Sequence, residues 1–172
     1  MTAQINCDIS QKSKKWNHLE NPIKLVDEIS KKLISLTELK KILTGNLTLE
    51  LSISLVSDAQ IKKINNQFRQ KNKPTNVLSF PSFDTDLIRN FGLKKIIGND
   101  NFVFLGDIVI SFDRVYIEAK LQKKTFENHL THLILHSILH LIGYDHNNDD
   151  EAKIMEDLEI KVLKTLKITN PY

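Results

Sequence analysis

Three regularly spaced histidines are the residues of this chain best suited to chemistry. His136, His140 and His146 stand in the segment HSILHLIGYDH, which runs from residue 136 to residue 146. Residues four apart on a helix lie on one face, so the imidazoles of His136 and His140 can reach one metal ion. Gly143 favours a helix end there, because glycine readily takes the left-handed conformation, and the turn can bring His146 back. Three histidine ligands with a position left open are typical of catalytic zinc sites.

The alternative interpretation is that these histidines are ordinary surface or core residues. A pair four apart is weak support for a metal site, but a third histidine at ten, after a glycine at seven, rarely arises by chance. Burying three imidazoles in so apolar a segment is also costly unless a partner satisfies them. We therefore expect a metal site. His129 and His132 share the predicted helix and are expected to pack or to contact ligands rather than to bind the ion, and His18 is expected at the surface.

The same spacing occurs in the HExxHxxGxxH motif of metalloproteases. In that motif a glutamate follows the first histidine and activates water as the general base. This chain has Ser137 at that position, and a serine is no base near neutral pH without help from another group. A metallopeptidase is therefore the least favoured function for this ligand pattern.

Hydrophobic periodicity indicates which elements position the motif. Helices are expected over residues 22–36, 57–68, 111–121, 126–142 and 148–166, and strands over 47–55, 77–80 and 102–110, with a turn at Gly45–Asn46. Ile61, Ile64 and Phe68 share one helical face, and the last helix should turn five residues inward: Ile154, Met155, Leu158, Val162 and Leu166. Residues 82–101 are expected to form a surface excursion. Helices and strands mix in both orders, which predicts an α/β or α+β domain: a small mixed sheet, about five helices and the histidine motif on a central helix.

Composition limits the class of protein without naming its function. The 172 residues are 41% hydrophobic and include only five glycines and four prolines, which favours one compact domain over residues 1–172. No apolar run approaches the ~20 residues of a membrane span, and no signal peptide is evident. The single cysteine, Cys7, fits a reducing, cytoplasmic location. A net charge of +3 permits an anionic partner such as nucleic acid but does not require one.

Four segments of the chain resemble one known family. HSILHLIGYDH is similar to the HGxLHLxGYDH signature of the YbeY-type endoribonucleases, which are bacterial rRNA maturation factors. FRQKNKPTNVLSFP (68–81), LGDIVI (105–110) and DDEA (149–152) resemble further family segments in the expected order. Ser137 stands where the family usually has glycine, and residues 82–101 form a longer segment than expected.

The resemblance implies a site and an activity. His136, His140 and His146 match the family's metal triad, usually taken to hold one zinc ion, and Arg69 matches an arginine of its proposed substrate site. The implied fold is a compact α/β domain whose triad helix lines a basic groove. The implied activity is that of a single-strand-specific, metal-dependent endoribonuclease. It would act on rRNA in maturation of the small-subunit 3′ end and in ribosome quality control, with the ribosome or its small subunit as partner.

Two interpretations remain open for several residues near these segments. The Arg69 guanidinium suits a phosphate because it can meet two oxygens at once, whereas Lys71 and Lys73 either guide the RNA backbone or are merely solvated. Asp107, in an apolar strand, either hydrogen-bonds a metal-bound histidine or makes a structural contact. Tyr144 and Asp145 are expected to shape the turn. The alternative function is a ribosome-associated assembly factor whose metal site is mainly structural.

Overall fold

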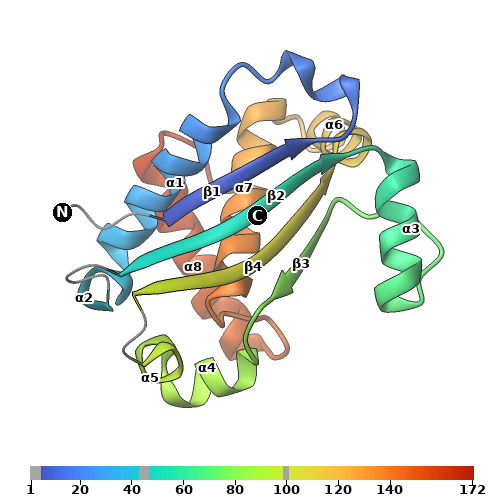
Figure 1. Cartoon of the computed structure of the whole chain (residues 1–172). Coiled ribbons are helices and arrows are strands. Elements are labelled where there is room, and N and C mark those ends of the chain that lie inside the picture. The colour runs from blue at the N-terminus through green and yellow to red at the C-terminus, as the bar shows by residue number, and fades with distance from the viewer. Residues whose placement is uncertain (1–4, 43–46, 99–100) are drawn as a thin grey trace.

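A mixed β-sheet forms the centre of the fold in the computed structural model, which describes residues 5–42, 47–98 and 101–172 (Figure 1). Among these residues the sheet has four strands in the order β1-β2-β4-β3. Their bounds are β1 (Ile5–Gln11), β2 (Thr48–Val56), β3 (Val77–Pro81) and β4 (Phe102–Ser111). β1, β2 and β4 run parallel, and β3 pairs antiparallel to β4.

Helices cover one face of the sheet more fully than the other. They are α1 (Pro22–Leu36), α2 (Leu39–Ile42), α3 (Asp58–Arg69), α4 (Thr85–Phe91), α5 (Leu93–Ile97), α6 (Phe112–Leu121), α7 (Phe126–Leu141) and α8 (Asp149–Thr165), with a 3-10 helix over Lys14–His18. α1, α7 and α8 lie behind the sheet in Figure 1, whereas α3 lies on the other side, beside β3. α7 runs through the middle of the larger layer, so the histidine motif is on a central helix.

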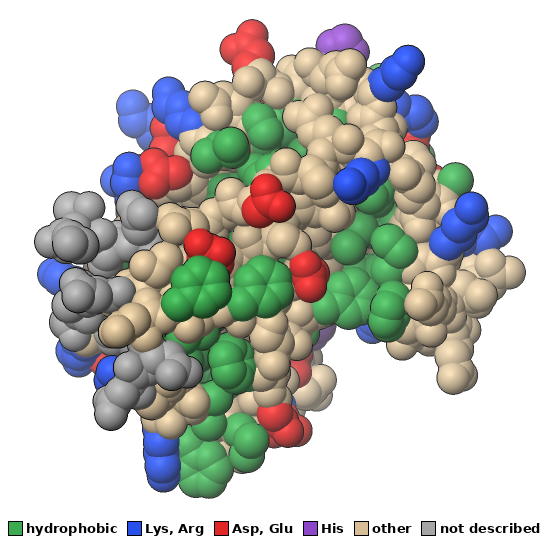
Figure 2. All heavy atoms as spheres, in the orientation of Figure 1, with side chains coloured by type: hydrophobic (Ala, Val, Ile, Leu, Met, Phe, Trp, Pro, Cys, Tyr) green, Lys and Arg blue, Asp and Glu red, His purple; other side chains and the backbone are tan. Residues whose placement is uncertain are grey.

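The two faces of β2 explain this arrangement. Its leucines and isoleucine, Leu49, Leu51, Ile53 and Leu55, alternate with polar residues and enter the main hydrophobic core with α1, α7 and α8. On the other face a smaller cluster of Val56, Ile61, Leu78 and Val109 seats α3 on the sheet. No other described helix covers the rest of that face, and Figure 2 shows acidic side chains among hydrophobic ones there.

The α+β class and the mixed sheet confirm the prediction from the sequence. β1 has no counterpart among the predicted elements, although its residues alternate as in a strand: Ile5, Cys7 and Ile9 are apolar, and the residues between them are polar. The predicted excursion at 82–101 contains α4 and α5, whose Ile88, Leu93 and Ile97 are buried in the main core. With α2 these short helices raise the number of described α-helices to eight. The predicted Gly45–Asn46 turn, and residues 99–100 of the excursion, lie outside the described residues.

One predicted core position on α8 is wrong. Met155 and Val162 are buried as expected, but Ile154 is 59% exposed. A helix buries one stripe, and Ile154 lies one residue, about 100°, away from Met155 around the axis. None of the described helices combines the length and the apolar character needed to cross a membrane.

Candidate metal centre

The end of α7 and the turn after it position the three histidines. The Thr125 side chain caps the helix by accepting from the Asn128 amide at 3.1 Å. α7 ends at Leu141, and Gly143 follows with a φ of +96°, as expected from its position in the motif. A Cβ on Gly143 would lie 2.5 Å from Cγ2 of Ile88, so both backbone conformation and space require glycine here.

The structure brings the three predicted metal ligands together. His136, His140 and His146 each offer a ring nitrogen, and these nitrogens all lie within 4.8 Å of one another. The Nε2 atoms of His136 and His140 are 3.1 Å apart. The first two imidazoles are half-buried and His146 is exposed, so the cluster opens toward solvent on one side.

The hydrogen bonds behind the rings fix which nitrogens face the cluster. His140 donates from Nδ1 to the carbonyl oxygen of Tyr144 at 3.0 Å, and His136 donates from Nδ1 to Oε1 of Glu159 at 2.8 Å. A carbonyl and a carboxylate only accept, so in both neutral rings the Nε2 lone pair faces the other histidine. Two lone pairs at 3.1 Å repel each other unless a cation lies between them. This donor set fits a zinc ion, which binds imidazole nitrogens at about 2.0–2.1 Å.

Burial keeps His140 neutral. Desolvation, together with the neighbouring imidazoles of His136 and His146, lowers the pKa of His140 to about 4. The ring is therefore unprotonated near neutral pH, and its Nε2 lone pair is free to bind a metal ion.

A buried carboxylate behind His136 was not among the predicted site residues. Glu159 has no exposed surface and also accepts hydrogen bonds from Nε2 of His132, at 3.2 Å, and from the Tyr172 hydroxyl. Burial by itself raises the pKa of a carboxyl group, but the hydrogen bonds outweigh it and lower the pKa of Glu159 to about 2. The signal in the sequence is its spacing: Glu159 lies four residues after Met155 and three before Val162, on the inward stripe of α8.

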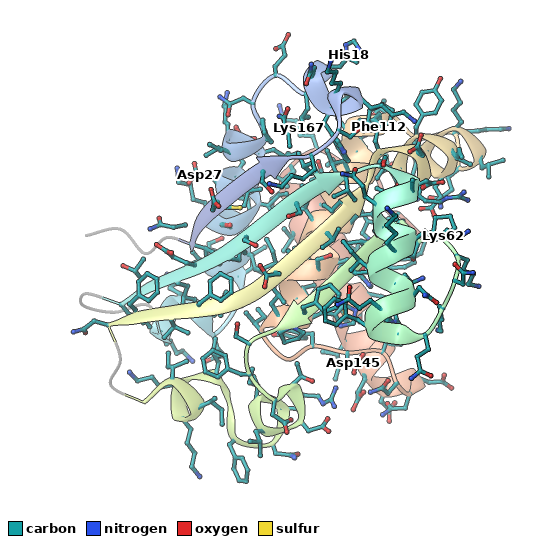
Figure 3. All side chains as sticks on the ribbon, turned by 45° about the vertical axis from the view of Figure 1, so that its right-hand side comes forward. His18, Asp27, Lys62, Phe112, Asp145 and Lys167 are labelled. Atoms are coloured by element: carbon teal, nitrogen blue, oxygen red, sulfur yellow. The ribbon has the colours of Figure 1, made fainter. Side chains whose placement is uncertain are left out.

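Two of the other histidines, His129 and His132, hydrogen-bond to carboxylates. His129 is buried, and its Nε2 lies 2.8 Å from Oε2 of Glu118 on α6. His132, His136 and Glu159 also bring ligand atoms within 4.8 Å of one another. Hydrogen bonds to Glu159 already occupy the atoms of that second group, so the triad is the better candidate for a metal ion. His18 is exposed and lies at the top of Figure 3, whereas Asp145, the chain neighbour of His146, lies in the lower part.

One cleft joins the triad to Arg69. Its volume is about 640 Å³, and its lining includes all three histidines, Arg69 and much of β3. Arg69 ends α3, and within the described part of the chain it forms no hydrogen bond or ion pair, so its guanidinium is available to an anion. Lys71 and Lys73 are exposed nearby but do not line the cleft.

Asp145 fixes the turn that carries His146. Its carboxylate accepts from the His146 amide at 2.9 Å and from Nη1 of Arg89 at 2.8 Å. Burial raises the pKa of Asp145, but these two hydrogen bonds outweigh it and lower that pKa overall. Figure 3 shows Asp145 just below the lower end of α3, and both Asp145 and Arg69 line the cleft. The contribution of Arg89 was not predicted, because it comes from the segment expected to be a surface excursion.

Asp107 does not hydrogen-bond to any of the described histidines. It is exposed on the open face of the sheet, where it accepts a hydrogen bond from the Ser52 hydroxyl of the neighbouring strand β2. Of the two interpretations open from the sequence, the structural contact is the one that the fold supports.

Comparison with known proteins identifies the family. A family model described as Endoribonuclease YbeY matches residues 8–167. The chain is 40% identical over 168 residues to the Endoribonuclease YbeY of Bartonella quintana (strain Toulouse), covering 98% of this chain and 97% of that protein. It is 46% identical over 126 residues to that of Bartonella bacilliformis, covering 73% of each. A solution structure of a Thermotoga maritima protein matches with a TM-score of 0.56 and 26% identity, over 95% of this chain and 91% of that one. This chain therefore belongs to the endoribonuclease YbeY family.

Proposed function

We propose that this chain is a single-strand-specific, metal-dependent endoribonuclease that processes ribosomal RNA. Its relatives carry the name endoribonuclease. That activity is also supported by a cleft in which three clustered histidines lie with an arginine that has no partner among the described residues. The proposed substrate is the 3′ end of small-subunit rRNA, with a further role in ribosome quality control in the cytoplasm. In this proposal residues 1–172 work as one hydrolase domain, with the ribosome or its small subunit as partner.

The proposed metal ligands are His136, His140 and His146, and the proposed metal is one zinc ion. Held by these three imidazoles, a zinc ion would supply Lewis-acid chemistry suited to activating water near neutral pH and to polarising a phosphoryl oxygen. The low pKa of His140 keeps its ring ready to bind without first losing a proton. Glu159 and the Tyr144 carbonyl hold two of the rings in the orientation that points Nε2 inward.

Arg69 is the proposed catalytic residue on the substrate side. Its guanidinium stays charged at every relevant pH and can donate two parallel hydrogen bonds to a phosphate. In the cleft it would bind the RNA backbone beside the triad and stabilise the negative charge that grows on the phosphoryl oxygens during hydrolysis. Asp145 and Arg89 hold the turn that carries His146. This histidine should therefore keep its place when the RNA backbone enters the cleft.

Two other functions are less well supported. A ribosome-associated assembly factor with a mainly structural metal site would need no open cleft, whereas this triad opens toward solvent through the exposed His146. A metallopeptidase would need a base after the first histidine. Ser137 is fully buried there, and its hydroxyl has no hydrogen-bond partner among the described residues.

Cleavage of a labelled single-stranded RNA tests the proposal. The wild-type protein is compared with His140→Ala, Arg69→Ala and the control Lys62→Ala, an exposed cation of α3 outside the cleft. Metal content is measured on the same samples. We expect cleavage to fall in the first two variants and to persist in Lys62→Ala, with metal lost only from His140→Ala. Equal cleavage by all four proteins would overturn the nuclease proposal and favour the assembly factor, and cleavage of a peptide would favour the peptidase.

A further inference from the structure

An exposed aromatic ring lies in the same cleft as the histidines. Phe68 is 61% exposed, and it lines the cleft together with the neighbouring Arg69. Exposing this much of a phenylalanine to water forgoes free energy that burial would provide. A large apolar side chain left open inside a polar cleft therefore indicates contact with a ligand.

The position of Phe68 in α3 shows that this exposure is not a random surface feature. Ile61, Ile64 and Phe68 follow one another at helical spacings of three and four, on the face that packs on the sheet. Ile61 is fully buried, Ile64 is half-buried and Phe68 is exposed. Burial decreases along the helix because its last turn lines the cleft instead of covering the strands.

Phe80 holds the ring from one side. The ring centroids of Phe68 and Phe80 are 5.2 Å apart, with their planes at 61°. Phe80 itself packs on the small cluster under α3 and is half-buried. The contact gives Phe68 a defined orientation while most of its surface remains open, and Figure 2 shows hydrophobic side chains exposed beside α3 on this side of the molecule.

Exposure alone does not distinguish Phe68 from other phenylalanines. Phe91 and Phe102 are 53% and 58% exposed, but neither lines the cleft. What sets Phe68 apart is its place in the cleft with the three histidines and beside the Arg69 guanidinium, which has no partner in the described part of the chain. Proteins that bind single-stranded nucleic acids combine these two elements: a cation for the backbone and an aromatic ring on which a base stacks.

We propose that Phe68 is the stacking site for one unpaired base of the RNA substrate, while Arg69 binds the backbone beside it. This inference rests on the endoribonuclease function proposed above and adds a source of strand specificity to it. Bases within a duplex already stack on one another and present no free face, so only single-stranded RNA could use Phe68.

Two probes separate stacking from backbone binding. One is a short, labelled single-stranded RNA, and the other is an oligomer of the same length whose sugar–phosphate backbone carries no bases. Affinity for each is measured by fluorescence anisotropy, and steady-state cleavage of the RNA gives KM and kcat. The full-length, metal-loaded proteins are the wild type, Phe68→Leu, Phe68→Trp and Arg69→Ala. Phe102→Leu is the matched control, because its side chain is nearly as exposed but lies outside the cleft.

Loss of one stacked base lowers affinity roughly 5- to 150-fold. We expect Phe68→Leu, which keeps an apolar side chain, to weaken RNA binding and raise KM about tenfold, and Phe68→Trp to retain wild-type binding. Neither variant should alter binding of the oligomer without bases, whereas Arg69→Ala should weaken binding of both probes.

The outcomes distinguish this inference from the function on which it rests. If the wild type cleaves RNA and Phe68→Leu behaves like Phe102→Leu, the stacking site is wrong and the nuclease proposal stands. If Phe68→Leu lost affinity for both probes equally, stacking would also be overturned, since this result would show damage to the cleft rather than loss of a base contact. A wild type that neither binds nor cleaves the RNA would overturn the proposed function itself.

Discussion

Nδ1 of His136 lies 2.8 Å from Oε1 of Glu159, a carboxylate with no exposed surface. This contact joins α7 to α8 behind the proposed metal site. It holds the His136 ring in the tautomer whose Nε2 lone pair points toward His140. The metal-binding geometry therefore depends on a residue that lies outside the histidine motif.

Glu159→Gln should weaken metal binding. The amide keeps the shape of the side chain but removes the negative charge that strengthens the hydrogen bond donated by His136. Losing such a partner typically costs about 10- to 100-fold in metal affinity. Zinc affinity, measured by competition with a chelator, checks this, with Asp157→Asn on the exposed side of α8 as the control. Unchanged affinity in Glu159→Gln would show that the hydrogen bond does not position His136.

Tyr172→Phe should have a smaller effect through the same carboxylate. The Tyr172 hydroxyl donates to Glu159, and its ring lies edge-on to His132 with centroids 5.6 Å apart. Removing the hydroxyl leaves Glu159 less firmly held, so zinc affinity should fall by less than in Glu159→Gln. The double variant Tyr172→Phe/Glu159→Gln should bind zinc as tightly as Glu159→Gln alone, because the effect of the Tyr172 hydroxyl passes through Glu159. Additive losses would contradict this linkage; Tyr116→Phe on α6 is the control.

Gly143→Ala should destabilise the fold more than Gly92→Ala. Both glycines have positive φ, +96° and +80°, so an alanine is strained at either position by about 1–3 kcal/mol. At Gly143 the new Cβ would also meet Ile88 at 2.5 Å, whereas nothing lies within 4 Å at Gly92. Overpacking of this kind costs about 1–3 kcal/mol more. Urea unfolding of the metal-free proteins measures the difference in the free energy of unfolding. Equal losses of stability in the two variants would mean that Ile88 can move away from the new Cβ without destabilising the fold.

RNA binding should weaken steeply with salt if the backbone supplies the main contacts. Each phosphate contact on a single strand contributes about 0.7 to the slope of log affinity against log salt concentration. Arg69→Ala should reduce that slope by about 0.7–1, because it removes one such contact. Lys24→Ala, on α1 away from the cleft, should leave the slope unchanged. A complex insensitive to salt would argue against the proposed cleft.

The free energy of unfolding should depend on pH through Glu118. Burial raises the pKa of this carboxyl, but hydrogen bonds from His129 and Asn76 outweigh it and lower the folded-state pKa below its ordinary value. A depressed pKa stabilises the fold above the unfolded value of about 4.3, and that contribution is lost as the pH falls through the folded pKa. Glu118→Gln should therefore destabilise the protein at neutral pH and progressively less in acid. A constant difference across the range would contradict this, and Glu38→Gln, largely exposed, is the control.

Regular patterns predicted the elements that carry the site. The alternation of Leu49 to Leu55 with polar residues defined β2, and the turn glycine at Gly143 marked the end of α7. Such signals are local, because the periods of strand and helix are set by backbone geometry. β1 carried such a signal, because Ile5, Cys7 and Ile9 alternate with polar residues, although it was not among the predicted elements, whereas the short helices α4 and α5 lacked one. Their few apolar residues are buried only because distant parts of the chain cover them.

By itself, the sequence determined the proposed metal ligands: the spacing of His136, His140 and His146 requires only one helix and one turn. The resemblance to a family marked Arg69. Only the tertiary structure decided what surrounds them. Glu159 reaches His136 from 23 residues away, and α3 brings Phe68 and Arg69 to the cleft. These contacts depend on how α3, α7 and α8 pack against one sheet, and that packing is set by the whole core rather than by any local segment.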